Sequence, residues 1–496
     1  MPVRLRFLAL LLLALSAQAQ QYRAFWADAF HYGFKNPGQI DQLLEDVLRA
    51  KSNAIFAEVR SRGDSYYVNS VEPPADDPDY APGFDALQYL IDNAHARGVE
   101  VHAWFPVMPL WTSSQPPANP NHLWHKHGPN AQRDDMWMTV DSTGKIGTSL
   151  DPGHPGAFQY LADLIVDVAA NYDVDGIHLD YIRYPETAIF GFNPVALQRF
   201  ARLYNRTGSV DPEDSDFSGF RRAQVTALVR QIYLRTFAIK PRVRISAALI
   251  TWGNGPLNDD QYRTKDAYSR VFQDWRGWLE EGILDIAVPM NYFREQQLPT
   301  YLDRWMEYEK NRQYGRMAIV GLAVYLNSIP DSLGQLKRAL TPSADGNAVA
   351  GVNFYSYAST NTLDNNGIVT TPSALFYAAI GDYFGDPAPV PDLPWKSNPQ
   401  RGHVYGWIRV DDGPAWRKDG IAVVIESDTG ADTTRQVLTD ATGFFGAVDL
   451  PPDRYRVRLL NPAFNFAPQD VAAGSAARFD IFLHDSDFGS TAQNRY

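Results

Sequence analysis

The chain has 496 residues, 45% of them hydrophobic, and a formal net charge of −12. This length exceeds one ordinary hydrophobic core and predicts two domains, and the apolar content argues against a disordered protein. An acidic chain without a basic run is a poor partner for nucleic acid or an anionic membrane. Cysteine is absent, which excludes disulfides, a thiol nucleophile, cysteine-bound metals and an acylated cysteine anchor.

The N-terminus has the three regions of a secretory signal peptide. Arg4 and Arg6 form a basic region, the apolar run Phe7–Leu15 follows, and Ala17-Gln18-Ala19 is a small-x-small cleavage site. The apolar run is too short to span a bilayer as a helix. We therefore expect cleavage of residues 1–19 and a periplasmic or secreted protein without a membrane anchor.

Residues 20–384 alternate short apolar segments with longer amphipathic ones. Eight strands, each followed by a helical pattern, predict an α/β fold of the (β/α)8 TIM-barrel type. A doubly wound open sheet is the alternative, which is weakened because no Gly-x-Gly-x-x-Gly turn follows the first strand. The expected strands are Tyr22–Asp28, Ala54–Arg60, Val99–Phe105, Gly176–Tyr181, Val243–Ile250, Leu284–Asn291, Met317–Tyr325 and Gly351–Tyr357.

A proline-rich segment, residues 385–401, follows the barrel pattern and predicts a semi-rigid linker. Short strand patterns separated by turn signals then predict a small all-β sandwich at 402–484, with a tail at 485–496. Residues 439–445 and 450–457 resemble the carboxypeptidase-regulatory-like, transthyretin-like β-sandwich. This resemblance implies an accessory domain rather than an enzyme.

The most informative motif is the run from Asp175 to Pro185, in which His178, Asp180 and Arg183 interrupt an apolar strand pattern. Burying an unpaired carboxylate is costly, so such a group is usually paired, shifted in pKa or used in chemistry. Parallel barrels present their chemistry at the carboxyl ends of the strands. We therefore predict a catalytic role for Asp180, with a simple ion pair to Arg183 as the alternative.

The second and third strands also end in polar or aromatic residues. On the two-residue period of a strand, Glu58 and Arg60 share a face and would both point into the barrel. Glu58 is then the best placed partner carboxylate, or else it only orients Arg60 in an ion pair. Arg62 and Asp64 follow in the loop, where a charge-paired turn and ligand contact are both open. Trp104 would stack on a sugar ring or pack as a core tryptophan.

Other reactive patterns are weaker. His122, His125 and His127 crowd one loop, but no carboxylate stands at a recognisable His-x-x-x-His ligand spacing, so a solvated or substrate-lining loop is favoured over a metal site. Ser246 and Ser356 lack the Gly-x-Ser-x-Gly elbow of serine hydrolases. We expect neither a metal nor a cofactor.

Together, the motifs resemble the glycosyl-hydrolase-like family related to family 10, also described as the YngK-type or DUF187 family. The match spans essentially the whole barrel, and the run from Asp175 to Pro185 is its most specific part. The motifs that carry the resemblance are Trp26-Ala27-Asp28, Glu58–Asp64, Ala94–Trp104, Leu150-Asp151-Pro152, Asp175–Pro185 and Met290-Asn291-Tyr292.

The resemblance implies a TIM barrel, an exported bacterial protein and glycoside hydrolysis, in some members of peptidoglycan strands stripped of their peptides. Such hydrolysis uses two carboxyl groups across the scissile bond. We expect Asp180 to be the nucleophile or base, ionised at neutral pH because Arg183 lowers its pKa. Glu58 is the expected acid. Because family members often carry Gln at this position, Asp28 and Asp64 stay open as substitutes.

The partner implied is a polysaccharide or a peptidoglycan glycan strand. Polar side chains would hold hydroxyl or N-acetyl groups, and the rings of Trp104, Trp252 and Tyr181 would stack on sugars. A non-catalytic glycan-binding protein on a decayed barrel is the competing hypothesis, and a deacetylase would need an Asp/His metal set that the chain does not offer. The expected substrate-binding residues are Asp28, Arg60, Asp64, Trp104, His178, Tyr181, Arg183, Trp252, Asn291 and Tyr292.

Overall fold

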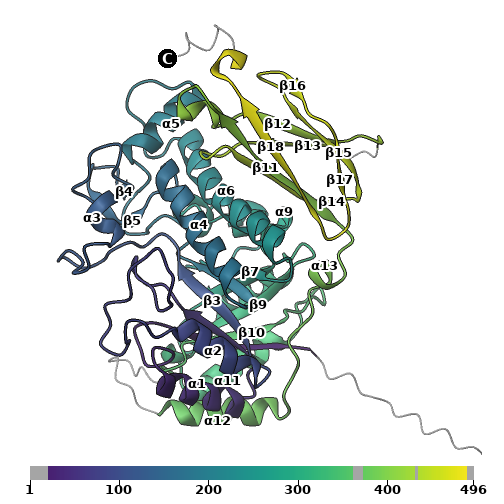
Figure 1. Cartoon of the computed structure of the whole chain (residues 1–496). Helices are drawn as coiled ribbons and strands as arrows, with labels where there is room; N and C mark the ends of the chain where they lie inside the picture. Colours follow the sequence, from purple (N-terminus) through teal and green to yellow (C-terminus); the bar gives the residue numbers. More distant parts are fainter. Residues whose placement is uncertain (1–19, 361–371, 431–433, 489–496) are drawn as a thin grey trace, which may run out of the picture.

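The computed structural model describes residues 20–360, 372–430 and 434–488, and its larger part is a closed barrel of eight parallel strands (Figure 1). The expected signal peptide lies outside the described residues. All eight expected strands are present, so the TIM-barrel prediction is confirmed. Around the barrel the strands are β1 (Tyr22–Ala27), β2 (Ala54–Glu58), β3 (Glu100–Pro106), β6 (Gly176–Asp180), β7 (Arg244–Leu249), β8 (Ile286–Asn291), β9 (Met317–Ala323) and β10 (Gly351–Tyr355).

Each barrel strand is followed by a helix that packs on the outside of the barrel, as a right-handed series of βα units requires. These helices are α1 (Pro37–Arg49), α2 (Ala86–His95), α4 (Pro155–Asn171), α6 (Ser215–Ile239), α9 (Trp275–Glu281), α10 (Pro299–Lys310), α11 (Ile329–Leu340) and α12 (Ser373–Phe384). The loops add the short helices α3 (Leu123–His127), α5 (Pro194–Tyr204), α7 (Asp259–Tyr262) and α8 (Asp266–Ser269), and the turn η1 (Val324–Leu326).

Local sequence signals account for where the elements begin and how they fit. Helix α1 starts where the Asn36 side chain accepts a hydrogen bond from Gln39 N, with a proline in its first turn. Inside the barrel, Gly176 opens β6 beside the ring of His102. A Cβ at Gly176 would lie 2.2 Å from His102 Nδ1, so only glycine fits at this point of the motif.

A polar insertion lies between β3 and α4. It contains α3 and the hairpin of β4 (Met138–Val140) and β5 (Ile146–Leu150). The three histidines of this insertion each bind a backbone carbonyl: His122 that of Arg62, His125 that of Pro117 and His127 that of Asp135, all at 2.8 Å. His122 therefore ties the insertion to the loop after β2, whereas the other two histidines stabilise the insertion internally. Among the described residues, no group of three or more His, Asp or Glu side chains is placed to hold a metal.

The proline-rich segment closes the amino-terminal end of the barrel rather than acting as a free spacer. Leu393 is buried in the cluster of side chains inside the barrel. Trp395 Nε1 donates to Asp285 Oδ1 at 2.7 Å, and Lys396 Nζ lies 3.1 Å from Asp285 Oδ2. Asp285 precedes β8 at the end of the barrel opposite the carboxyl ends, which places it in a stabilising role. The segment includes α13 (Pro394–Ser397).

The C-terminal domain is an all-β sandwich beside α6 (Figure 1). One sheet has the order β14-β11-β18, and the other has the order β13-β12-β15-β16 with β17 paired to β15. Its described strands are β11 (Gly402–Val410), β12 (Ala422–Ser427), β13 (Thr434–Leu438), β14 (Phe444–Leu450), β15 (Asp453–Leu459), β16 (Phe464–Asn465), β17 (Gln469–Val471) and β18 (Ala476–Leu483), with turns η2 (Ala415–Lys418) and η3 (Asp485–Phe488). Its transthyretin-like family remains a prediction.

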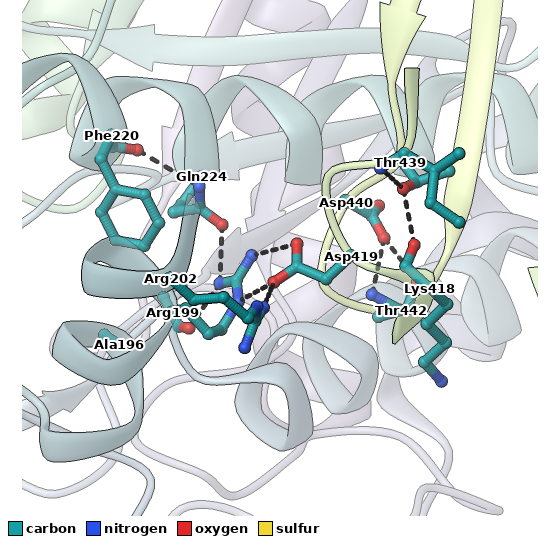
Figure 2. A network of polar contacts seen from close by, with 12 residues as sticks. Ala196, Arg199, Arg202, Phe220, Gln224, Lys418, Asp419, Thr439, Asp440 and Thr442 are labelled. Carbon is teal, nitrogen blue, oxygen red and sulfur yellow. Dashed lines mark hydrogen bonds and ion pairs between the residues drawn. The ribbon is translucent and has the colours of Figure 1, made fainter. Parts of the chain in front are cut away.

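Figure 2 shows the polar network that fixes the sandwich to the barrel helices α5 and α6. Asp419 of the sandwich accepts from Arg199 Nε at 2.8 Å and also pairs with Arg202. Arg199 donates in addition to Gln224 Oε1 at 2.8 Å. Arg199 and Asp419 are both buried, so this ion pair is part of a buried contact between the two domains. Among the described residues, no helix combines the length and apolar character needed to cross a bilayer.

Candidate active site

A cavity of about 420 Å³ opens at the carboxyl ends of the barrel strands, where a parallel barrel places its chemistry. Strands β1, β2, β3, β6, β7, β8 and β10 and the loops after β1, β2, β3, β6, β8 and β9 supply its walls. Its lining contains both carboxylates predicted to be catalytic, together with aromatic and polar side chains: Trp26, Phe30, Glu58, Ser61, Arg62, Trp104, Pro106, Met108, Pro109, Thr112, Thr148, Ser149, Asp180, Tyr181, Arg183, Pro185, Glu186, Thr187, Ala248, Met290, Tyr292, Tyr325 and Tyr355.

Glu58 is the last residue of β2 and its carboxyl group is buried. Its Oε2 atom accepts a hydrogen bond from Ala29 N at 2.8 Å. Burial, which disfavours the charged form, raises the pKa of Glu58 well above its usual range, and the negative charges of Asp28 and Asp180 raise it further. Glu58 is therefore a carboxylic acid that keeps its proton at a pH where ordinary carboxyl groups have lost theirs.

Asp180 is the last residue of β6 and has more donors around it than Glu58. Its Oδ1 accepts from Tyr181 N at 2.6 Å and from Arg183 Nη1 at 3.3 Å, and its Oδ2 accepts from Trp104 Nε1 at 3.3 Å. These donors favour the charged form, yet burial outweighs them and raises the pKa of Asp180 above its ordinary value. Arg183 lowers the pKa of Asp180 as expected, but its contribution is smaller than the opposing effect of burial.

A third carboxylate, Asp28, follows β1 and does not line the cavity. Its Oδ1 binds His31 Nδ1 at 2.7 Å and the backbone N–H of Phe30 at 3.0 Å, and its Oδ2 is buried without a hydrogen-bond partner among the described residues. The bond to Asp28 raises the pKa of His31. Asp28 acts on the cavity through its charge, which disfavours ionisation of Glu58.

Aromatic rings form much of the cavity wall. Tyr292 stacks on Tyr355 with ring centres 5.2 Å apart and an interplanar angle of 19°. Trp26 meets Trp104 at 6.5 Å, and Tyr325 packs edge-on against Tyr355 at 5.7 Å. Such faces suit the apolar sides of sugar rings, as stacking on Trp and Tyr requires flat, fixed surfaces.

His178 lies beneath this wall and does not line the cavity. Its Nε2 accepts from Trp26 Nε1 at 2.9 Å and its Nδ1 lies 2.9 Å from Ser246 Oγ. Burial lowers the pKa of His178 well below its ordinary value, so the ring is neutral and can accept from Trp26 while donating to Ser246. His178 therefore orients a wall residue and makes no direct contact with the cavity.

The turn after β6 brings two predicted residues into the cavity wall. Tyr181 has a φ of +46°, in the left-handed region that residues other than glycine seldom adopt. The Tyr181 N–H donates to Asp180 Oδ1, and the Tyr181 ring, which is 41% exposed, lies beneath the Arg183 guanidinium at 4.1 Å. A backbone conformation of this kind at a cavity is typical of functional sites.

Arg60 does not reach the cavity. Its Nε binds Glu72 Oε2 at 2.9 Å, and its Nη1 donates to the carbonyl oxygens of Pro106, Val107 and Pro109. The two-residue alternation that would align Arg60 with Glu58 stops because β2 ends at Glu58. Arg60 instead ties the loop after β2 to the end of β3, so the structure does not support its predicted substrate contact.

Three other predicted residues also lie outside the cavity. Asp64 Oδ1 accepts from Arg62 N at 3.1 Å and so stabilises its own turn. Asn291 is fully buried and its Nδ2 donates to Glu309 Oε2 at 3.0 Å, while burial raises the pKa of Glu309 to about 8. Trp252 packs against the hydrophobic core outside the barrel strands. None of these side chains faces the cavity.

Sequence reasoning missed several wall residues. Trp26 and Tyr355 lie at the carboxyl ends of β1 and β10, where the rule that selected Trp104 and Tyr292 would also have selected them. Arg62, for which the sequence left a charge-paired turn and ligand contact equally open, lies in the loop after β2 and lines the cavity. The fold decides between these alternatives, because it brings this loop beside the insertion after β3.

The arrangement suits acid and base chemistry on a sugar. Two carboxyl groups from different strands of the barrel, Glu58 and Asp180, line one cavity, and burial has shifted both of their pKa values upward. Donors around Asp180 hold its charged form, whereas the neighbours of Glu58 oppose ionisation. Pairs of carboxyl groups in unlike environments are what glycoside hydrolysis uses.

Comparisons with known proteins agree with this chemistry. The model of the family "Glycosyl hydrolase-like 10" matches residues 21–331. Glycosyl hydrolase YngK of Bacillus subtilis (strain 168) is 26% identical over 381 residues, which are 72% of this chain and 68% of that protein. Glycosyl hydrolase DigH of Escherichia coli (strain K12) is 26% identical over 268 residues, 50% of this chain and 56% of that protein. The chain thus spans little more than half the length of DigH.

The similarity to solved structures concerns the fold. A β-galactosidase from Bacillus circulans sp. alkalophilus is similar with a TM-score of 0.51 and 11% identity, over 79% of this chain and 59% of that chain. Because the family model covers more than half of the sequence, the chain belongs to the glycosyl hydrolase-like 10 family, and the prediction of a glycosidase-type enzyme is confirmed at that level.

Proposed function

We propose that the protein is an exported glycoside hydrolase that cleaves a cell-wall or extracellular polysaccharide, peptide-free peptidoglycan strands being the first candidate. The observation that carries the proposal is the meeting of Glu58 and Asp180 in one aromatic-walled cavity. The names of the relatives support hydrolysis of glycosidic bonds. The choice of a cell-wall glycan rests on the sequence resemblance and on the expected signal peptide.

In the proposed mechanism Glu58 is the general acid. Its raised pKa keeps the proton that the leaving oxygen of the scissile bond needs, and the Ala29 N–H fixes the direction of its carboxyl group. After proton transfer, the new negative charge at Glu58 is opposed by Asp28 and Asp180, which favours return of the proton from water. General acid catalysis of this type contributes roughly 10²- to 10⁴-fold in rate.

Asp180 is the proposed nucleophile or base. Three donors, the Tyr181 N–H, the Arg183 guanidinium and the Trp104 indole N–H, stabilise its carboxylate inside a buried site. These donors hold the carboxylate in one orientation, in the same cavity wall as the rings of Trp104 and Tyr292. A sugar stacked on that wall would present its anomeric carbon to a group already fixed in place.

The test is incubation of the purified chain from Gln20 with peptide-free peptidoglycan strands and a panel of bacterial polysaccharides, with products read by mass spectrometry. Asp180→Asn and Glu58→Gln serve as active-site variants. Asp41→Asn, which changes an exposed carboxylate on α1, is the matched control. We expect fragments from the wild type and the control alone. Binding to a glycan without fragments from any variant or from the wild type would instead support the non-catalytic hypothesis.

A further inference from the structure

One wall of the cavity carries a positive charge that the proposed mechanism does not use. Arg62 lines the cavity, and its Nε is buried without a hydrogen-bond partner among the described residues. No ion pair joins Arg62 to a carboxylate in the part of the chain that the structure describes. Arg183, the other arginine of the cavity, is already paired with Asp180. A partly buried guanidinium without a paired anion is costly, so binding an anionic group of a ligand would stabilise it.

The backbone around Arg62 is fixed, so this charge is held in place. Arg62 N donates to Asp64 Oδ1 at 3.1 Å, and Arg62 O accepts from His122 Nε2 at 2.8 Å. The next residue, Gly63, has a φ of +79° and lies so close to His122 that a Cβ would be 2.8 Å from its ring. The guanidinium itself lies over the ring of Trp111 at 5.3 Å. The loop is therefore preorganised against the insertion after β3.

Neutral hydroxyl groups line the same wall. Leu110 N and Trp111 N both donate to Thr148 O, at 3.0 and 3.2 Å, which places β5 beside the segment that Arg62 contacts. The cavity lining there includes Thr112, Thr148 and Ser149. One guanidinium and nearby hydroxyls make a site for a planar group with a single negative charge.

We infer that Arg62, with Thr112, Thr148 and Ser149, binds a carboxylate carried by the substrate sugar. The two oxygens of a carboxylate can accept hydrogen bonds from two N–H groups of the guanidinium, and its single negative charge neutralises the single positive charge of Arg62. A phosphate ester would instead carry up to two negative charges. The inference deepens the proposed function and rests on it, since it assigns the charge of the sugar that the hydrolase accepts. It makes Arg62 the residue that selects an acidic sugar over a neutral one.

The test compares one polymer in two charge states. Peptide-free peptidoglycan strands carry a free lactyl carboxylate on each muramic residue, and conversion of these groups to primary amides removes the charge while keeping the backbone. Wild type, Arg62→Gln and Arg62→Lys are assayed on both polymers for kcat/KM. Arg97→Gln, which removes an exposed charge beyond α2, is the control.

We expect amidation to lower wild-type kcat/KM by roughly 10- to 100-fold, the range for one lost charge-assisted hydrogen-bond pair. Arg62→Gln should lose a similar factor on the charged strand and nothing further on the amidated one, and Arg62→Lys should recover part of the loss. Equal losses for Arg62→Gln on both polymers, or a wild type indifferent to amidation, would overturn the inference while leaving the hydrolase proposal intact.

A binding measurement separates the two proposals if no polymer is cleaved. Saturation-transfer NMR with N-acetylmuramic acid and with its neutral counterpart N-acetylglucosamine tests the subsite without turnover. Stronger signals for the acidic sugar in wild type, lost in Arg62→Gln and kept in Arg97→Gln, would support the carboxylate subsite. The same signals in wild type and in Arg62→Gln would refute it.

Discussion

Glu58→Gln tests two properties of Glu58 separately: its role as general acid, and the free energy of folding that the burial of its carboxyl group costs. The amide keeps the size of the side chain and an oxygen that accepts from Ala29 N, and it removes the ionisable group. We expect turnover to fall by roughly 10²- to 10⁴-fold, the contribution of a general acid. The alkaline limb of the kcat/KM profile, which reports deprotonation of the acid in the free enzyme, should disappear in the variant.

The same substitution should stabilise the folded protein at high pH. The pKa of Glu58 is higher in the folded than in the unfolded chain, so its protonation favours folding at low pH, and that contribution is lost as the pH rises through the folded pKa. Each unit of the shift is worth about 1.4 kcal/mol. The amide that Glu58→Gln introduces carries no such penalty, so the variant should gain stability over wild type at pH 8 and not at pH 4.

Thermal and urea unfolding at these two pH values, beside pH profiles of kcat/KM, measure both effects. Glu45→Gln, an exposed substitution on α1, is the matched control and should change neither. A variant that keeps the alkaline limb would show that another group donates the proton. A stability difference between wild type and Glu58→Gln that is the same at pH 4 and pH 8 would refute the argument from burial.

Three further substitutions test the site and the domain junction. Asp180→Asn should fold with an unchanged melting temperature within a few degrees and lose several orders of magnitude in turnover; near-wild-type activity would remove Asp180 from the mechanism. Trp104→Phe keeps a ring but loses the N–H to Asp180, and should lower kcat about tenfold for one hydrogen bond of about 1.5 kcal/mol. A change in KM alone would contradict this role. Asp419→Ala leaves Arg199 buried without its carboxylate and should cost about 3–5 kcal/mol in urea unfolding, whereas a loss under about 1 kcal/mol would show that the junction is held by other contacts.

The barrel could be predicted from the sequence because its strands are continuous apolar runs of similar length. Asp180 and Glu58 could be selected from the sequence because each stands at the end of such an apolar run. A carboxylate at that position usually takes part in chemistry or in an ion pair. Arg60 was expected to contact substrate because it shares a strand face with Glu58, but in the structure it pairs with Glu72, which lies in a loop with no periodic pattern, and it does not line the cavity. The position of that partner follows only from the folded loop.

The distinction between lining and supporting residues also depended on the fold. His178 and Asn291 both stand near the ends of strands, yet His178 binds Trp26 and Ser246 and Asn291 binds Glu309, all away from the cavity. A strand pattern gives the face to which a side chain points, but it does not give the depth of that side chain along the barrel axis. That depth decides whether a polar group meets a ligand or a neighbouring strand.

The two carboxyl groups also differ in the order in which they lose protons. Burial raises both pKa values, but Asp180 has an arginine and two N–H donors, whereas Glu58 has one backbone donor besides Ser61 and faces two negative charges. Asp180 should therefore ionise first, and its charge then holds the proton on Glu58. The proposed roles need this order, with a carboxylate at Asp180 and an acid at Glu58 over the same pH range. The order also predicts that Asp180→Asn, by removing one of the two charges, lowers the pKa of Glu58, which NMR of a labelled glutamate side chain can measure.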